Sequence, residues 1–356
     1  MEVNDLDQYI LYRAVGDATP SHYDTIPGNV TEYHDENLKY DRRYTYAVQA
    51  LTQCDQSKLS EEHSVVPGPY DIILADYYHQ SLVKLTYDCN HLIELYDGLT
   101  PTDIAKINDR IFFTNLWDNS LNSMDQSGDI QSYSLDEAPV DFAPDTTNGY
   151  LYVLTRDNNS LFTFTLEGTN LGKVTLGLDI HFQTTCAYDP VLDCLWITDD
   201  SNHKIYRYDL STDILNEIAD DIGYPDEIIV DTINGGCLIA GLEGIIHINS
   251  DGTITQTMPN HYIYDFSRDN QTGRLYYSGF STETDSWEIG YVKDDIRTVL
   301  NTSYSYIYKI KTIPESSGTG LVLIDGNYGE IIRLNAQGEE IGRRSSIYGV
   351  MGIVLQ

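Results

Sequence analysis

Basic side chains are scarce in this sequence. Its 356 residues contain 21 Lys and Arg against 55 Asp and Glu, which gives a formal net charge of −34. A surface of this sign repels nucleic-acid phosphates and anionic membranes, so both are poor partners. Cations, basic proteins and neutral glycans stay compatible with it. The alternative is that the charge only keeps the protein soluble.

Long apolar runs are also missing. No stretch approaches the ~20 apolar residues that a membrane-spanning helix needs, so we predict no membrane insertion. The N-terminus does not look like a secretory leader, because Met1 is followed by the acidic residues Glu2, Asp5 and Asp7. A mature secreted chain or a part of a larger protein has the same appearance, so this start does not decide the location.

Motifs of common catalytic and metal sites are absent as well. The sequence has no G-x-S-x-G, no Walker-type loop, no dinucleotide fingerprint, no H-E-x-x-H and no C-x-x-C. It has 5 cysteines: Cys54, Cys89, Cys186, Cys194 and Cys237. Cys186 and Cys194 flank the turn at Asp189-Pro190 and could face each other across a hairpin. Either they form a disulfide in an oxidising compartment, or they are buried thiols.

Residues 1–66 read as a separate β-module. Residues 44–51 alternate with the period of a half-buried strand, and residues 61–66 read as a closing strand. The Tyr-Ile-Leu-Tyr-Arg run at 9–13 and the Tyr-x-Tyr-x-Val-x-Ala run at 44–50 resemble the second half of a fibronectin type III domain. That resemblance implies a partial β-sandwich whose first two strands are missing. Its open sheet edge would suit self-association.

From Tyr70 onward, one pattern recurs about every 40–45 residues, which is typical of a propeller or solenoid. Each copy is an apolar run, a polar turn and a second alternating strand. The apolar runs begin at Ile72, Ile111, Leu151, Leu195, Cys237, Leu275 and Leu321. The segment Asp199-Asp200-Ser201-Asn202-His203-Lys204-Ile205 resembles the Asp-x-x-Asn-x-x-Ile signature of NHL-type propeller repeats, with looser versions at 76–83 and 325–331.

The first repeat lacks its innermost strand, since Pro67-Gly68-Pro69 stands in its place. The apolar segment 348–355 at the other end has no partner of its own. Placing this tail in the first blade closes the ring and removes both sheet edges. We therefore predict an all-β protein. Residues 67–356 form a β-propeller of about seven four-stranded blades, closed by the C-terminal strand, after the partial fibronectin type III-like sandwich of 1–66.

Alignment of the repeats places acids at the start of the innermost strands. These are Asp103, Asp141, Glu227 and Asp265, with Thr185 at the same position of the fourth repeat. In a propeller they would ring one mouth of the channel. Four carboxylates there could hold a hard cation such as Ca²⁺, or a cationic group of a partner. The alternative is that they satisfy local backbone amides.

Two histidines, His181 and His261, precede innermost strands and could face the same mouth. A histidine among acids there would suit a propeller hydrolase or lyase that uses a divalent cation. In the absence of a catalytic motif, we instead expect an extracellular or cell-surface binding protein. Its propeller would present a face to a protein or glycan partner without catalysis. A third hypothesis is a self-assembling surface or filament subunit.

Overall fold

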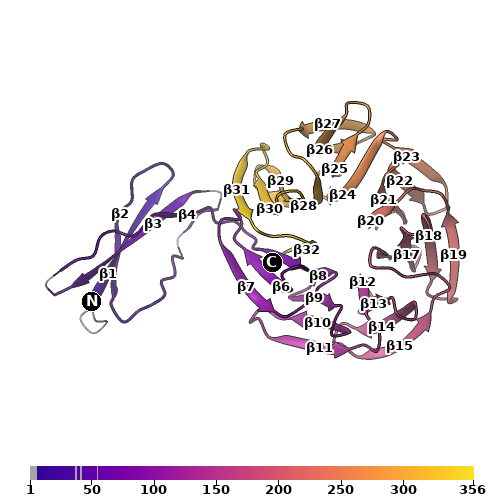
Figure 1. The fold of residues 1–356 in the computed structure, drawn as a ribbon, viewed down its shortest axis with the longest axis horizontal. Coiled ribbons are helices and arrows are strands. Elements are labelled where there is room, and N and C mark those ends of the chain that lie inside the picture. Colours follow the sequence, from indigo (N-terminus) through magenta and orange to yellow (C-terminus); the bar gives the residue numbers. More distant parts are fainter. Residues whose placement is uncertain (1–5, 37, 41, 54) are drawn as a thin grey trace. The chain divides into compact units, whose positions relative to one another are not determined.

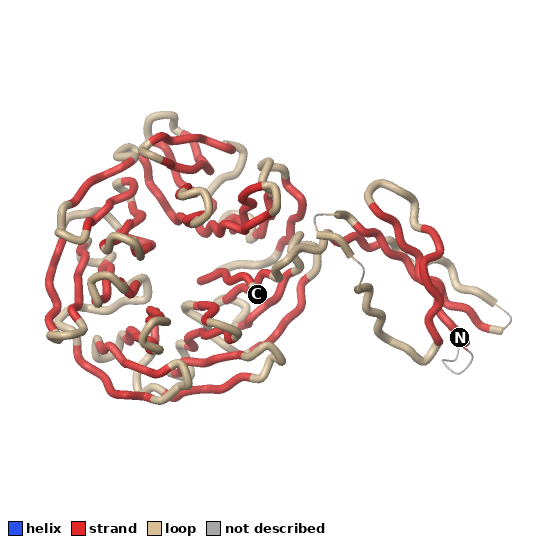
Figure 2. Tube along the Cα trace, turned by 180° about the vertical axis from the view of Figure 1, so that it is seen from behind, coloured by secondary structure: helices blue, strands red, loops and turns tan. Residues whose placement is uncertain are grey.

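The structure is a computed structural model that describes residues 6–36, 38–40, 42–53 and 55–356. These residues form strands joined by loops and turns (Figure 2). No helix within them is long and apolar enough to cross a membrane. The chain divides into two compact units. One contains the described residues up to Ile72 with 84–93 and Gln356, and the other contains 73–83 and 94–355.

The N-terminal module is one antiparallel sheet of order β2-β1-β3-β4. Its strands are β1 (Leu6–Val15), β2 (Ser21–Pro27), β3 (Tyr44–Thr52) and β4 (His63–Val65). The runs at 9–13, 44–51 and 61–66 were predicted as strands and correspond to β1, β3 and β4, whereas β2 was not anticipated. The described residues of this module contain no second sheet, so the module forms half of a sandwich at most.

Seven further four-stranded sheets follow, and their innermost strands surround one axis (Figure 1). The first contains β32 (Val350–Leu355), β5 (Ile72–Asp76), β6 (Ser81–Leu85) and β7 (Leu92–Asp97). The next three contain β8 (Ile104–Ile107), β9 (Arg110–Asn115), β10 (Ser120–Met124), β11 (Ile130–Ser134); β12 (Pro139–Asp145), β13 (Tyr150–Thr155), β14 (Ser160–Thr165), β15 (Asn170–Thr175); and β16 (Cys186–Asp189), β17 (Cys194–Asp199), β18 (Lys204–Asp209), β19 (Ile214–Ala219).

The last three contain β20 (Pro225–Val230), β21 (Gly236–Gly241), β22 (Gly244–Asn249), β23 (Ile254–Thr257); β24 (His261–Asp269), β25 (Arg274–Ser281), β26 (Ser286–Lys293), β27 (Ile296–Asn301); and β28 (Ile307–Glu315), β29 (Gly318–Asp325), β30 (Glu330–Leu334), β31 (Glu340–Ser345). This arrangement is a β-propeller, as predicted. The C-terminal strand β32 pairs with β5, which confirms that the tail completes the first sheet.

The sequence pattern explains both the packing and the turns. Second strands are buried on both faces, because neighbouring sheets cover them, and Trp196 in β17 is fully buried. Asp145, Asp189, Asp231 and Asp269 each end an innermost strand or follow it, and their carboxylates accept backbone N–H groups of the next turn. These acids are turn-forming residues.

We call the end of the propeller where the innermost strands begin the upper end. Four of these strands have a register shift there, between Pro139 and Asp141, Pro225 and Glu227, Ile263 and Asp265, and Ile307 and Lys309. Each shift is a β-bulge, which adds one residue and re-aims the side chains around it. Asp226 and Tyr308 are two such added residues.

Candidate functional site

Two cavities lie along the channel, and the innermost strands line both. The upper one has a volume of about 320 Å³ and the lower one about 770 Å³. Residues at the start of the strands line the upper cavity, and residues toward their ends line the lower one. Asp103, Glu227 and Lys309 border both, so a charged constriction separates the two cavities.

The structure brings the predicted acids to this part of the channel. Asp103, Asp141, Thr185 and Glu227 line the upper cavity, and Asp265 lines the lower cavity. Two of these acids, Asp141 and Asp265, also satisfy backbone amides, which was the alternative role. Asp265 accepts the backbone N–H groups of Phe266 and Ile310 at 2.8 and 2.7 Å, and Asp141 accepts that of Cys186 at 2.5 Å.

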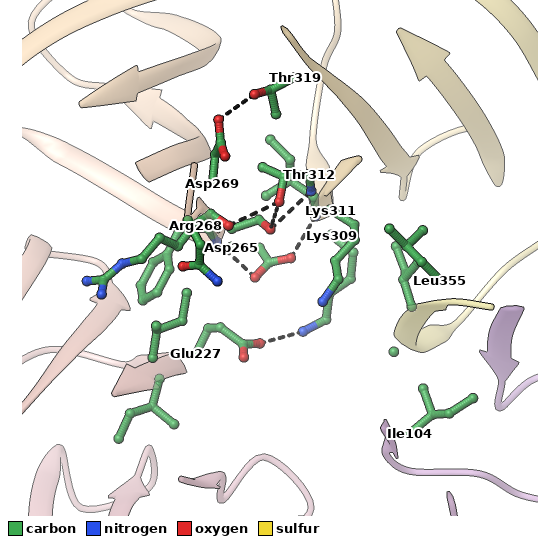
Figure 3. A pocket seen from close by; sticks show the side chains of 18 of the residues that line it. Ile104, Glu227, Asp265, Arg268, Asp269, Lys309, Lys311, Thr312, Thr319 and Leu355 are labelled. Atoms are coloured by element: carbon green, nitrogen blue, oxygen red, sulfur yellow. Dashed lines mark hydrogen bonds and ion pairs between the residues drawn. The ribbon is translucent and has the colours of Figure 1, made fainter. Parts of the chain in front are cut away.

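Lys309, which the sequence analysis missed, occupies the centre of the constriction. Its Nζ donates to Glu227 Oε2 at 2.7 Å (Figure 3). Burial acts to lower the pKa of Lys309, but Glu227, Asp265 and Asp103 together raise it, so the ammonium stays charged. No group of three or more His, Cys, Asp or Glu among the described residues is arranged to hold a metal ion. An ammonium group thus lies among the carboxylates for which we predicted Ca²⁺, which are Asp103, Asp141, Glu227 and Asp265, and the Ca²⁺ site stays a prediction.

Asp103 and Asp141 form a coupled carboxyl pair at the floor of the upper cavity. Burial raises the pKa of both groups. The negative charge of Asp103 and the hydrogen bond between the two carboxyls raise the pKa of Asp141 further, and the same hydrogen bond opposes the rise at Asp103. Burial also raises the pKa of Asp265 to about 7. The channel therefore carries less negative charge than its acids suggest.

The two histidines do not join this site. His181 is half-buried, and its Nε2 lies 3.4 Å from Asp179 Oδ2. His261 is buried beside Glu288 and Arg297, within its own sheet. No histidine lines either cavity within the part of the chain that the structure describes. The structure does not place His261 at the channel mouth as predicted, because its side chain lies beside Glu288 of β26, and His181 lies beside Asp179 without lining either cavity.

The proposed disulfide is also absent. Cys186 lies opposite Ile197 in the register of β16 and β17, and Cys194 lies opposite Asp189. The two thiols are thus at opposite ends of the hairpin, and both are buried and not bridged. Burial raises the pKa of Cys194 to about 12 and that of Cys186 well above its ordinary value. Cys54 lies outside the described residues.

Aromatic side chains, which the sequence analysis did not assign to the site, form much of the upper wall. They are Phe142, Phe182, Tyr264, Tyr306 and Tyr308. The ring of Phe182 packs against that of Tyr77 at 5.3 Å between centroids, so the loop before β16 meets the turn after β5. Asp226, the added residue of its bulge, also lines this cavity.

Comparisons with known proteins add the fold alone. No family model and no curated protein sequence matches the chain. Similar solved structures include virginiamycin B lyase from Staphylococcus aureus, with 16% identity, 70% of this chain and 87% of that chain covered and a TM-score of 0.56. A functionally unknown protein from Desulfotomaculum acetoxidans aligns at 12% identity, over 80% and 98% of the two chains, with a TM-score of 0.61. A protein from Lactobacillus plantarum aligns at 14% identity, over 81% and 99%, with a TM-score of 0.60.

Proposed function

We propose that this protein is an extracellular or cell-surface binding protein whose propeller presents its upper end to a basic protein partner, without catalysis. The observation that carries the proposal is where exposed aromatic rings lie. The turns between second and third strands, and the segments that lead into innermost strands, are all at the upper end. Five exposed aromatic residues lie in them: Tyr78, Trp117, Tyr224, Tyr328 and Tyr348.

The contrast with the lower end supports an interface. Trp117 is 70% exposed and Tyr78 is 72% exposed, whereas the large exposed side chains of the lower turns are the aliphatic Val191 and Ile233. Tyrosine and tryptophan are enriched at the centres of protein interfaces, because they bury much area at a low cost in side-chain entropy. Single exposed aromatics are ordinary, but a set confined to one end is not.

Charge favours a basic protein as the partner. The connecting segments of the upper end contain one Lys or Arg, Arg156, which lies next to Asp157. They contain many acids, among them Asp118, Asp179, Asp200, Asp220, Asp221, Glu243, Glu283 and Asp285. A neutral glycan would gain nothing from this field, whereas a basic protein gains both attraction and association rate.

Peptide and glycan arrays test this proposal. We expect the protein to select peptides rich in Lys and Arg, and the triple variant W117A/Y328A/Y348A to bind them at least tenfold more weakly. Ile233→Ala, at the lower end, is the matched control and should bind like the wild type. Selection of acidic peptides, or equal binding by the triple variant, would overturn the proposal. Selection of glycans through the same aromatics would replace the protein partner by a glycan.

Catalysis as a lyase or hydrolase is the second candidate. The hydrogen-bonded pair Asp103 and Asp141 favours it, because burial raises the pKa of both carboxyls and such groups in a cavity suit acid–base chemistry. Against it, a solved variant of the similar virginiamycin B lyase with one histidine changed to alanine is described as catalytically inactive. The cavities here have no histidine in their described lining. Incubation with quinupristin, followed by mass spectrometry, separates the two candidates, because any enzyme-dependent product would establish catalysis.

The N-terminal module is proposed to be a fibronectin type III-like spacer. Its single sheet and the hydrogen bond from the Lys39 N–H to the Tyr44 hydroxyl, at 2.9 Å, support this, since tyrosines at the start of a strand make such bonds in related sandwiches. A role in self-assembly is the third candidate, because β2 and β4 are edge strands of the described sheet. Concentration-dependent light scattering tests it, and we expect a monomer.

A further inference from the structure

The upper cavity is small and partly covered. Its volume of about 320 Å³ corresponds to roughly ten water molecules at ~30 Å³ each. Phe182 lines it from the loop before β16 and packs against Tyr77, in the turn after β5. A space of this size accepts one side chain or one small organic molecule, and it is too small for a folded segment.

The wall of this cavity presents several aromatic rings in fixed positions. Tyr264 packs against Tyr306 and Trp287 at 5.2 and 5.3 Å between centroids, and Trp287 packs against Tyr306 at 5.5 Å. The ring of Tyr308 lies next to that of Tyr306, at 6.2 Å between centroids. Its hydroxyl accepts the Val350 N–H at 2.8 Å, and this bond holds the ring in place. Aromatic faces that are held in this way attract organic cations through their negative quadrupoles.

One carboxyl group in the cavity lacks a partner. Glu227 pairs with Lys309, Asp141 accepts the Cys186 N–H, and Asp103 is hydrogen-bonded to Asp141. Asp226 lines the same cavity and has neither a hydrogen bond nor an ion pair within the described chain. It is half-buried beside Tyr264, whose pKa it helps to raise. Burial raises the pKa of Asp226 to about 6, and the charge of Lys309, at the border of the same cavity, opposes this rise without forming an ion pair with Asp226. An acidic group that is partly removed from water and has no ion-pair partner favours a ligand that brings a positive charge into direct contact with it.

The bulge in β20 is what places Asp226 there. In a regular strand, Asp226 and Glu227 would point to opposite faces. The register shift between Pro225 and Glu227 instead lets both side chains line the cavity. The same device places Tyr264 with Asp265 and Tyr308 with Lys309 along the channel. Ring faces and the unpaired carboxyl are therefore brought together by one repeated backbone feature.

A metal ion does not fit this site, since the described residues contain no metal-binding group of three ligands. A neutral ligand would leave Asp226 without a direct ion-pair partner. We infer that the upper cavity binds an organic cation, an alkylammonium or alkylguanidinium group, between Asp226 and the aromatic wall. The inference rests on the proposed function in one respect: the lysine or arginine side chain of a basic partner is the source of such a group that the upper end favours.

Small probes test the cavity without any partner protein. Calorimetric titration at pH 7.5 uses n-butylguanidinium and n-butylammonium, with 1-butanol as the neutral control of similar shape. We expect saturable binding of both cations, in the millimolar range for fragments of this size, and no saturable binding of 1-butanol. Asp226→Asn should weaken cation binding at least tenfold, because the charge is lost while the shape is kept. Asp220→Asn, which removes an exposed acid of the same end, should bind like the wild type.

Equal binding of butanol and the cations, no saturable binding at all, or equal binding by D226N and D220N would each overturn the inference. D226N removes an unpaired, partly buried charge, so we expect it to fold. Its thermal unfolding is measured beside that of D220N, so that a loss of binding can be distinguished from misfolding. The peptide array separates this inference from the proposed function. If D226N and D220N select basic peptides equally while W117A/Y328A/Y348A does not, the proposed interface is supported and the binding of a partner's cationic side chain in the upper cavity is contradicted.

Discussion

The two ends of the channel are built from the same strands but have different chemistry. At the upper end, bulges and connecting segments gather aromatic rings and an unpaired carboxyl around a cavity of about 320 Å³. At the lower end, the cavity of about 770 Å³ is bordered by short polar turns and by Arg268 and Lys311 (Figure 3). The acids of the lower turns, such as Asp269, are fully engaged by Thr272, Thr319 and backbone N–H groups.

This difference shows where the repeat is constrained and where it is not. The lower turns between first and second strands repeatedly contain an Asp whose carboxylate accepts hydrogen bonds from the backbone N–H groups of the following residues. A tight turn needs those hydrogen bonds. The upper connections vary from two residues between β21 and β22 to ten between β15 and β16. The upper connections can vary without disturbing the sheets, so they can carry binding residues, as loops do on other rigid scaffolds.

The largest effect is expected at the constriction that the two ends share. Lys309→Met leaves Glu227 without its cation, beside the buried acids Asp265 and Asp103. Breaking one side of a fully buried ion pair costs about 3–5 kcal/mol. The side chains of Lys309 and Glu227 are 24% and 28% exposed, so urea unfolding should show a loss near the lower end of this range. The double variant K309M/E227Q should recover part of it, because the uncompensated charge is gone. If K309M were as stable as the wild type, the channel would be open to water and the two cavities would be one.

The second expected effect is a pH dependence that comes from the lower cavity. Burial raises the pKa of Asp265 from 3.8 to about 7, so the folded chain holds a proton that the unfolded chain releases above pH 4. This contribution is complete below pH 4 and is lost as the pH rises through 7. A shift of this size corresponds to at most about 4 kcal/mol.

Asp265→Asn should therefore flatten the fall in stability between pH 4 and pH 7, as measured by urea unfolding at several pH values. Asp251→Asn removes the same formal charge from an exposed turn at the lower end, and local hydrogen bonds lower the pKa of Asp251. It is the matched control and should leave the slope in place. Equal slopes for D265N and the wild type would show that water reaches Asp265 in the channel.

How far the sequence predicted these features depends on the length scale. The apolar runs at Ile72 and Leu195 and the alternating strands after them predicted the sheets. A strand that is buried on both faces consists of consecutive apolar residues, which are visible in the local sequence. The acids at the start of β20 and β24 were found by aligning the repeats. The bulges were not found, since one added residue breaks the two-residue period that the prediction used, and this hid Asp226.

Other features depend on residues far apart in the chain. Lys309 pairs with Glu227 across 82 positions, and Phe182 contacts Tyr77 from another sheet, so no local pattern announces either contact. The error at His261 has the same origin. Its place before an innermost strand was read correctly, but the direction of the side chain depends on Glu288 and Arg297 in neighbouring strands. In the N-terminal module, β2 was missed because Ser21–Pro27 has a largely exposed, polar composition.

The third effect compares one glycine from each end. Gly349 and Gly273 both have a positive φ, +70° and +72°, which costs a substituted alanine about 1 kcal/mol in backbone strain. A methyl group at Gly273 would meet open space, whereas one at Gly349 would overlap the ring of Tyr78. We expect G273A to lose about 1 kcal/mol and G349A about 2 kcal/mol in urea unfolding. G349A should also bind basic peptides more weakly than G273A, because Tyr78 must leave its position at the upper end.

The smallest effect uses one thiol from each end of a single hairpin. Cys186 borders the upper cavity and is 7% exposed, whereas Cys194 is 1% exposed at the lower end of β17. Since burial raises the pKa of both thiols, little thiolate forms at pH 7.5, and we expect iodoacetamide to leave both unmodified in the native protein. Phe182→Ala uncovers the upper cavity and should make Cys186 reactive while Cys194 stays protected, as peptide mass spectrometry would show. Reaction at both cysteines would mean that the variant unfolds the whole sheet, and reaction at neither would mean that Phe182 does not close the upper end.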